Sequence, residues 1–175
     1  MKLNRMRSAL LIMALLMPAA LRPMAQKTNF SGTWKLNVEK SFLGNEHRTA
    51  DYQLTKTIEQ KDDQIKQTDV AVHVSIMNIP LPDSTTTLEL ATDGKPHDMR
   101  GAAFFPGMPT PLIKVSAVWQ GDTLYVREIS QPADAASKTY RRFFLSDNGT
   151  ELNELIEGHT GFGDTEQHLI FDRQP

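Results

Sequence analysis

The side chains best suited to metal binding or acid–base chemistry are five histidines, and their spacing forms no known site. The sequence contains no His-x-His, His-x-x-x-His or His-Glu-x-x-His arrangement, which are spacings that bring imidazoles to one metal ion. It also lacks a Gly-x-Ser-x-Gly elbow, a lysine-bearing phosphate loop and any cysteine. We therefore predict no metal site, no cofactor and no catalytic residue. An acid and a base that the fold brings together need no local sequence motif, so an enzyme of unknown chemistry stays open as an alternative function.

Arginines are the next side chains whose direction matters for binding. Arg141 and Arg142 are adjacent, so they project from opposite faces of a strand and one of them points inward or toward a rim. Arg127 presents the same choice. An arginine inside a protein needs a carboxylate, water or the anionic head of a ligand as partner. If one of these arginines lines a cavity, we predict an amphipathic anionic ligand.

An apolar loop, Gly-Ala-Ala-Phe-Phe-Pro-Gly-Met-Pro-Thr-Pro at residues 101–111, is the most unusual segment. Loops are normally polar because their backbone must be hydrated. The two phenylalanines and the methionine would plug the barrel end, cover its mouth as a flap, or dock onto a partner protein or a membrane. The side chains that we expect to contact a ligand are Tyr52, His73, Phe104, Phe105, Met108, Trp119, Arg127, Tyr140 and Arg142.

Short strands joined by tight turns would position these side chains. Apolar and polar residues alternate over residues 52–58, which is the period of a half-buried strand. Asp-Gly at 93–94 and Asn-Gly at 148–149 are typical of hairpin turns, and Gln-Gly-Asp at 120–122 offers another. The apolar positions change parity near residues 67–69, which predicts a bulge. Further strands are predicted at residues 65–76, 84–90, 112–119, 124–129, 138–145, 151–157 and 165–173.

The number of strands predicts the architecture. About nine or ten strands in one small domain must hide their edges by closing into a barrel or by splitting into a sandwich. Short turns favour neighbours in sequence as neighbours in the sheet. We predict an all-β fold, a single antiparallel up-and-down barrel of about eight to ten strands, whose interior holds side chains or one small ligand.

The first 25 residues have the order of a secretory signal peptide: a basic start, a short apolar core and small residues. Cleavage after Ala25, or alternatively Ala20, would leave residues 26–175 as the barrel domain, exported to a periplasmic or secreted location. An uncleaved anchor is the alternative. Cleavage after Ala25 removes four of the 19 basic residues and none of the 21 acidic ones, which changes the formal net charge from −2 to −6. With no basic stripe, nucleic acid is not an expected partner.

The beginning and end of the barrel domain resemble known families. Phe-Ser-Gly-Thr-Trp-Lys-Leu at residues 30–36 resembles the Gly-x-Trp first strand of lipocalins and the opening of fatty-acid-binding proteins. Residues 169–174 look like the last strand of fatty-acid-binding proteins. The resemblance implies a calycin β-barrel, similar to bacterial secreted lipocalin-like proteins. In such a barrel Gly32 and Trp34 close the floor, and Arg173, or else Arg141 or Arg142, packs over the indole.

Two departures limit what the resemblance implies. The ten residues 41–50 are too few for the helical hairpin that follows the first strand of fatty-acid-binding proteins. The Arg-x-Tyr pair that holds the ligand carboxylate in that family corresponds to Leu169 and Phe171, so the clamp is not carried over. We predict a carrier of a small apolar or amphipathic ligand in a cavity lined by aliphatic and aromatic side chains. The alternative is a fully packed barrel that binds a protein through the loop at residues 104–108.

Overall fold

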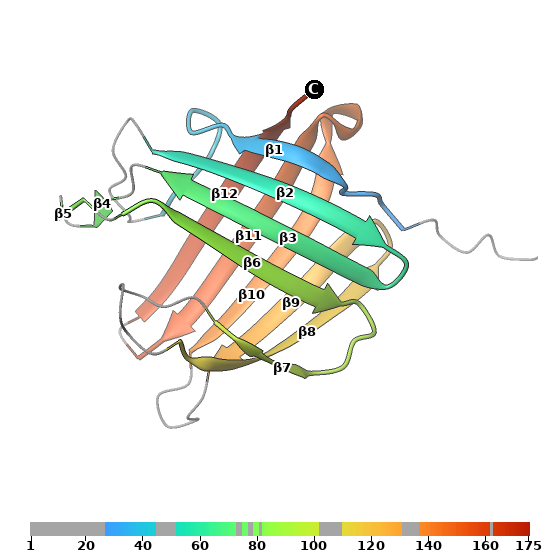
Figure 1. Ribbon diagram of the computed structural model, residues 1–175, viewed down its shortest axis with the longest axis vertical. Coiled ribbons are helices and arrows are strands. Elements are labelled where there is room, and N and C mark those ends of the chain that lie inside the picture. The colour runs from blue at the N-terminus through green and yellow to red at the C-terminus, as the bar shows by residue number, and fades with distance from the viewer. Residues whose placement is uncertain are drawn as a thin grey trace, which may run out of the picture.

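The computed structural model describes residues 27–44, 52–72, 75–76, 79–80, 82–101, 110–130, 137–161 and 163–175. Strands make up most of this part of the chain (Figure 1). They are β1 (Gly32–Leu36), β2 (Gln53–Lys61), β3 (Gln64–Val72), β4 (Ser75–Ile76), β5 (Ile79–Pro80), β6 (Ser84–Ala91), β7 (His97–Arg100), β8 (Leu112–Gln120), β9 (Thr123–Ser130), β10 (Lys138–Ser146), β11 (Glu151–Thr160) and β12 (Gly163–Arg173).

Ten strands form one antiparallel sheet in the order β6-β3-β2-β1-β12-β11-β10-β9-β8-β7. The first strand pairs with both the second and the last, so the start of the barrel domain lies beside its end. The sheet curls until it is nearly closed (Figure 1). This confirms the predicted all-β, up-and-down barrel. A separate two-stranded sheet is formed by β4 and β5.

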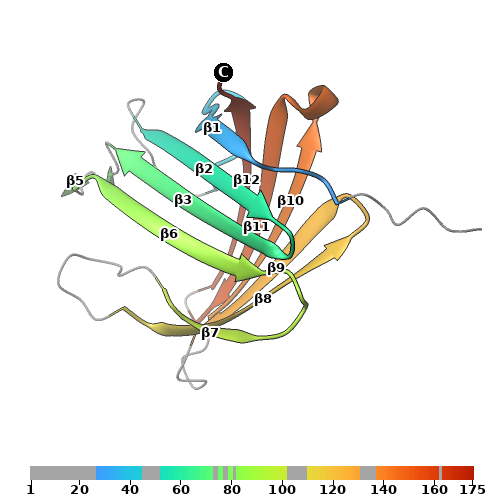
Figure 2. The same ribbon diagram turned by 45° about the vertical axis from the view of Figure 1, so that its right-hand side comes forward.

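The barrel stays open between β6 and β7, although these two strands follow one another in the sequence. They form opposite edges of the sheet, and Figure 2 shows them diverging. The hairpin predicted at the Asp-Gly dipeptide is therefore wrong. The Gly94 N–H donates instead to the Ala117 carbonyl at 2.9 Å, and the Thr92 N–H donates to the Asp63 carbonyl at 2.8 Å. The connection thus bonds to the turn between β2 and β3 and to β8, and one edge of β6 has no β partner among the described residues.

The other predicted hairpins are confirmed. β8 pairs with β9, and β10 pairs with β11 along its whole length. The turn between β10 and β11 is a short 3-10 element, η2 (Asp147–Gly149), in which Asn148 and Gly149 have φ of 53° and 85°. Asparagine and glycine tolerate these left-handed values better than other residues, which explains why the dipeptide marks a turn.

The predicted bulge in β3 is absent. β3 pairs with β2 in continuous register from Gln64 to Val72. Ile65 is buried on the inner face, and Gln67 and Asp69 share its parity, whereas Val70 is 39% exposed. The valines of this strand therefore face outward. The alternation misled the prediction because the inner face of β3 carries polar side chains after Ile65.

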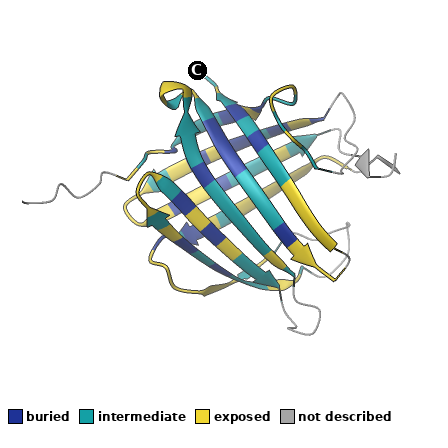
Figure 3. Cartoon of the chain, turned by 180° about the vertical axis from the view of Figure 1, so that it is seen from behind, coloured by how far each residue is buried: buried dark blue, intermediate teal, exposed yellow. Residues whose placement is uncertain are grey.

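The apolar core fills one end of the barrel. Buried and exposed positions alternate along the strands in Figure 3, as expected for a sheet with one buried face. Phe30 lies at the centre of this core, with its ring 5.2 Å from that of Trp119 and 6.5 Å from that of Phe143. In the described part of the chain, no helix is long and apolar enough to cross a bilayer.

Candidate functional site

Trp34 and Arg173 close the floor of the barrel. The Trp34 indole is fully buried and donates through Nε1 to the Phe30 carbonyl at 2.9 Å. The Arg173 guanidinium lies over the indole, 4.3 Å from the ring centroid, and its Nε donates to the Gly149 carbonyl at 3.1 Å. Gly32 has φ of +140°, and a Cβ there would lie 3.3 Å from Arg173 Nη1. The floor therefore needs both the backbone freedom and the small size of this glycine.

A buried lysine lies above this apolar floor. Lys56 projects inward from β2, with its ammonium 5.4 Å from the ring centroid of Phe171 and 5.9 Å from that of Phe143. It donates to both carboxylate oxygens of Asp69, at 3.0 and 2.9 Å. It also forms an ion pair with Glu154 at 3.3 Å. Because Glu154 lies on β11, this contact spans the barrel interior across β1 and β12.

Glu154 continues the chain of charges toward β9. It accepts a hydrogen bond from Arg141 Nη1 at 2.8 Å, and Arg141 Nε donates to Glu128 at 2.8 Å. Lys56 and Glu154 are each only 1% exposed. We call the series Asp69, Lys56, Glu154, Arg141 and Glu128 the inner charge chain. Its signs alternate, so every cation has two carboxylate partners and each terminal carboxylate has one cation.

The contacts within the inner charge chain determine its protonation. Burial by itself would raise the pKa of Glu154, but the charges of Lys56 and Arg141 and their hydrogen bonds outweigh burial, and the pKa lies below its ordinary value. For Arg141, burial would lower the pKa, but Glu128 and Glu154 raise it above its ordinary value. Both groups are therefore charged in the folded state at neutral pH.

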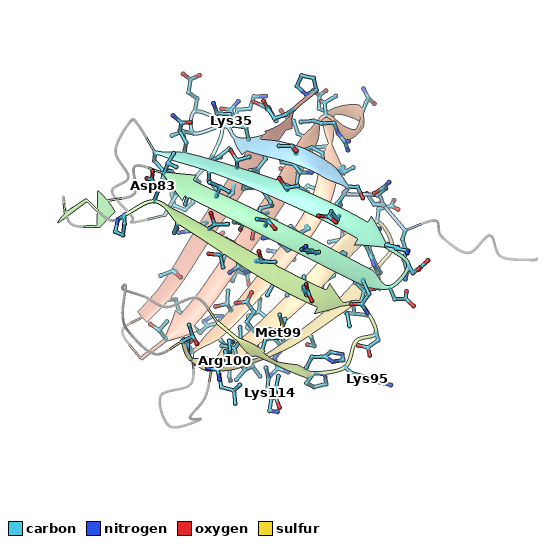
Figure 4. The ribbon with its side chains drawn as sticks, viewed as in Figure 1. Lys35, Asp83, Lys95, Met99, Arg100 and Lys114 are labelled. Atoms are coloured by element: carbon cyan, nitrogen blue, oxygen red, sulfur yellow. The ribbon has the colours of Figure 1, made fainter. Side chains whose placement is uncertain are left out.

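A cavity of about 270 Å³ adjoins the inner charge chain. Asp69, Arg141 and Glu128 line it from three strands, and Leu88 and Ile113 contribute apolar surface. Arg100 of β7 also lines it, and Figure 4 shows this side chain on the side of the barrel where β7 lies. The remaining lining residues are Gln67, Thr86, Thr87, Gly101, Pro111, Ser130 and Ser137. Most of the described lining residues are therefore polar in type, whereas the prediction was an aliphatic and aromatic lining.

A second pocket, of about 440 Å³, lies on the outer face of the sheet. Its main walls are Tyr125 and Arg127 of β9 with Tyr140 and Arg142 of β10. These residues alternate with the inward-facing Val126, so they point away from the interior. Arg142 forms an ion pair on this outer face with Glu157 of β11.

The predicted ligand-contacting residues fall into three groups. Tyr52 belongs to the apolar core, and Trp119 packs against it. Arg127, Tyr140 and Arg142 line the outer pocket. The remaining four, His73, Phe104, Phe105 and Met108, lie outside the described residues. Of the two adjacent arginines, Arg141 is the one that points inward.

Sequence analysis missed four members of the inner charge chain. Lys56 has the same parity as the buried Leu54 and Ile58 of β2, and Glu154 has that of Leu152 on β11. A charged residue on the apolar face of a strand was therefore the available signal. Glu128 likewise has the parity of the buried Leu124 and Val126 of β9, and Asp69 has that of the buried Ile65 of β3. Among the described residues, no group of three or more His, Asp or Glu side chains is placed to hold a metal ion.

No protein-family model matches this chain, and no match is found among curated proteins. Solved structures do match it. Zebrafish ileal bile acid-binding protein, complexed with cholic acid, aligns with a TM-score of 0.53 and 16% identity over 83% of this chain and 98% of that one. Human cRBP IV, a cellular retinol-binding protein, aligns with a TM-score of 0.51 and 17% identity over 84% and 99%. The chain has a calycin fold.

A further solved structure also aligns with this chain. Secretory abundant heat soluble protein 4 from Ramazzottius varieornatus aligns with a TM-score of 0.51 and 8% identity over 86% of this chain and 99% of that one. At such low identities a shared calycin fold does not define a ligand. The site must therefore be argued from the side chains of this chain.

Proposed function

We propose that this protein binds a small amphipathic molecule noncovalently inside its barrel, in the cavity beside the inner charge chain. The observation that carries this proposal is the cavity of about 270 Å³ in an interior that is otherwise packed on its floor side. Its volume lies near the lower limit of ligand pockets, which span roughly 300–1,000 Å³. The ligand is therefore small.

The walls support an amphipathic ligand. Leu88 and Ile113 offer apolar contacts, while Asp69, Glu128 and Arg141 offer charged groups. A wholly apolar molecule would leave these polar groups without water or partner, which is unfavourable. The similarity in fold to a protein whose structure holds cholic acid also supports an interior site.

The proposal is tested by isolating the protein without denaturation, extracting it with organic solvent and analysing the extract by mass spectrometry. We expect one small molecule in stoichiometric amount, or uptake of an added amphipathic probe. Thr86→Trp should abolish this binding because Thr86 lines the cavity. Thr85→Trp is the matched control, since this neighbour is also exposed but pairs with Val70 on the outer face. An empty extract with no probe uptake would overturn the proposal and favour the packed barrel that docks through residues 104–108.

We also propose that residues 1–25 direct export of the chain. The support is their basic start, apolar core and small residues. The full chain should be expressed in a bacterial host, separated into cytoplasmic, membrane and exported fractions, and its N-terminus measured by intact mass. Export with a new terminus at Gln26 or Leu21 is expected. An intact N-terminus in the cytoplasmic fraction would refute export.

A further inference from the structure

The inner charge chain restricts which charge the polar head group of the ligand can carry. Resting on the proposed function, we infer that this end is cationic, an amine, and that the barrel disfavours carboxylated amphiphiles. Sequence analysis linked an inward arginine to an anionic ligand. The structure changes that expectation, because the inward Arg141 already contacts Glu128 and Glu154 at 2.8 Å each.

The first step is the charge balance. Two cations, Lys56 and Arg141, meet three carboxylates, Asp69, Glu128 and Glu154, so the inner charge chain has a net charge of −1. Neither cation is available as a sole partner for a ligand carboxylate. An entering anion would meet the excess negative charge of the inner charge chain, and an ammonium group would neutralise that excess.

The second step is which members of the chain face the cavity. Asp69, Glu128 and Arg141 line it, with side chains 25%, 17% and 26% exposed, whereas Lys56 and Glu154 lie behind them. The two carboxylates with only one cation each are thus the ones in reach of a ligand. Glu128 uses Oε1 for Arg141, and its Oε2 accepts no hydrogen bond from any described residue. This oxygen is the acceptor that we assign to the amine.

The third step is the charge of Arg100 on β7. Arg100 also contributes to the lining, but it is an exposed residue. Water and salt screen an exposed charge much more than a buried one. Its effect on a head group beside Glu128 is therefore smaller than that of the less exposed carboxylates of Asp69 and Glu128. The Thr86 hydroxyl adds a further acceptor to the same cavity, and it suits an ammonium donor.

A matched set of ligands tests the inference. Octylamine, octanol and octanoate have the same tail and differ in head-group charge. Their binding to the purified protein should be measured by titration calorimetry at neutral pH and about 0.15 M salt, which limits long-range attraction. We expect octylamine to bind at least about tenfold more tightly than octanoate, a difference of roughly 1.4 kcal/mol.

Two cavity variants and one control locate the effect. Glu128→Gln and Asp69→Asn each remove one negative charge from the cavity and should reduce the preference for the amine by about tenfold. Two variants are used so that loss of folding in one does not end the test. Glu157→Gln also removes one negative charge, but from the outer face beside Arg142, and it should leave the preference for the amine unchanged. Thr86→Trp should block octylamine, as it blocks other ligands.

The outcomes separate this inference from the proposed function. Binding of none of the three ligands would count against an amphiphile site as a whole. Binding of octanoate as tightly as octylamine would refute the charge inference and retain the site. A preference that survives both cavity variants, falls equally in Glu157→Gln, or persists in Thr86→Trp would place the amine elsewhere and would also refute it.

Discussion

Replacing Glu154 by glutamine tests the most unusual contact in the structure, the buried link between β2 and β11. The carboxylate accepts from Arg141 and forms an ion pair with Lys56, and it is almost completely buried. Glutamine has the same shape but offers one carbonyl oxygen, so only one of the two cations keeps an acceptor. The other faces an amide N–H₂ group, which is a donor and repels it.

The magnitude follows from the remaining contacts. A hydrogen bond to a charged group contributes about 1.5–3 kcal/mol. Leaving a buried charge without any partner costs about 3–5 kcal/mol. The second value is an upper limit here, because Lys56 keeps Asp69 and Arg141 keeps Glu128. We therefore expect Glu154→Gln to lower the free energy of unfolding by about 2–3 kcal/mol.

Urea unfolding at neutral pH, followed by tryptophan fluorescence and circular dichroism, measures this difference. The control is Glu157→Gln on the same strand. Its ion pair with Arg142 is exposed, with side chains 44% and 42% accessible, so its loss should cost less than about 1 kcal/mol. If Glu154→Gln destabilises no more than Glu157→Gln, the link across the interior does not contribute as the geometry indicates.

Three further predictions concern acid stability and the barrel floor. The folded-state pKa of Glu154 lies below its ordinary value of 4.5, so the charged carboxylate stabilises the fold above that pH, and this stabilisation is lost as the pH falls through the folded pKa. Urea midpoints measured down to about pH 3 should therefore fall less steeply in Glu154→Gln than in the wild type. Gly32→Ala should lower the free energy of unfolding in urea by about 1–3 kcal/mol, because alanine at φ of +140° is strained and its Cβ approaches Arg173. An unchanged urea midpoint would contradict this prediction. Trp34→Phe should lower the free energy of unfolding by about 2–4 kcal/mol in thermal unfolding, since it removes the hydrogen bond to the Phe30 carbonyl and leaves a void. A loss below about 1 kcal/mol would show that the indole does not support the floor.

The sequence predicted most of the fold because alternation and turn residues are local signals. The dipeptide at Asn148-Gly149 predicts both a turn and the pairing of its flanking strands, and both are present. Asp93-Gly94 predicts a turn equally well, but its flanking strands become opposite edges of the sheet. A turn fixes the direction of the backbone, whereas pairing depends on which strand already occupies each edge, and that is decided by the whole sheet.

The candidate site was harder to predict for the same reason. Parity within β2 places Lys56 on the buried face, and parity within β11 does the same for Glu154. Neither strand indicates that the two side chains meet, because they are separated in the sheet by β1 and β12. Their contact arises only when the sheet curls. The adjacent arginines show the same limit: the sequence predicts that one points inward, and the register identifies Arg141.

Glu154 also distinguishes two explanations for a preference of the barrel for amines. Its side chain lies behind the cavity wall and does not line the cavity, yet Glu154→Gln changes the net charge of the inner charge chain from −1 to 0. If the field of the whole chain selects the ligand, this variant should weaken octylamine and strengthen octanoate without altering octanol. If direct contact with Glu128 alone selects it, all three affinities should stay in their wild-type ratio. The first result is expected, because Glu154 is almost completely buried, and a buried charge is screened less and acts over more than one contact.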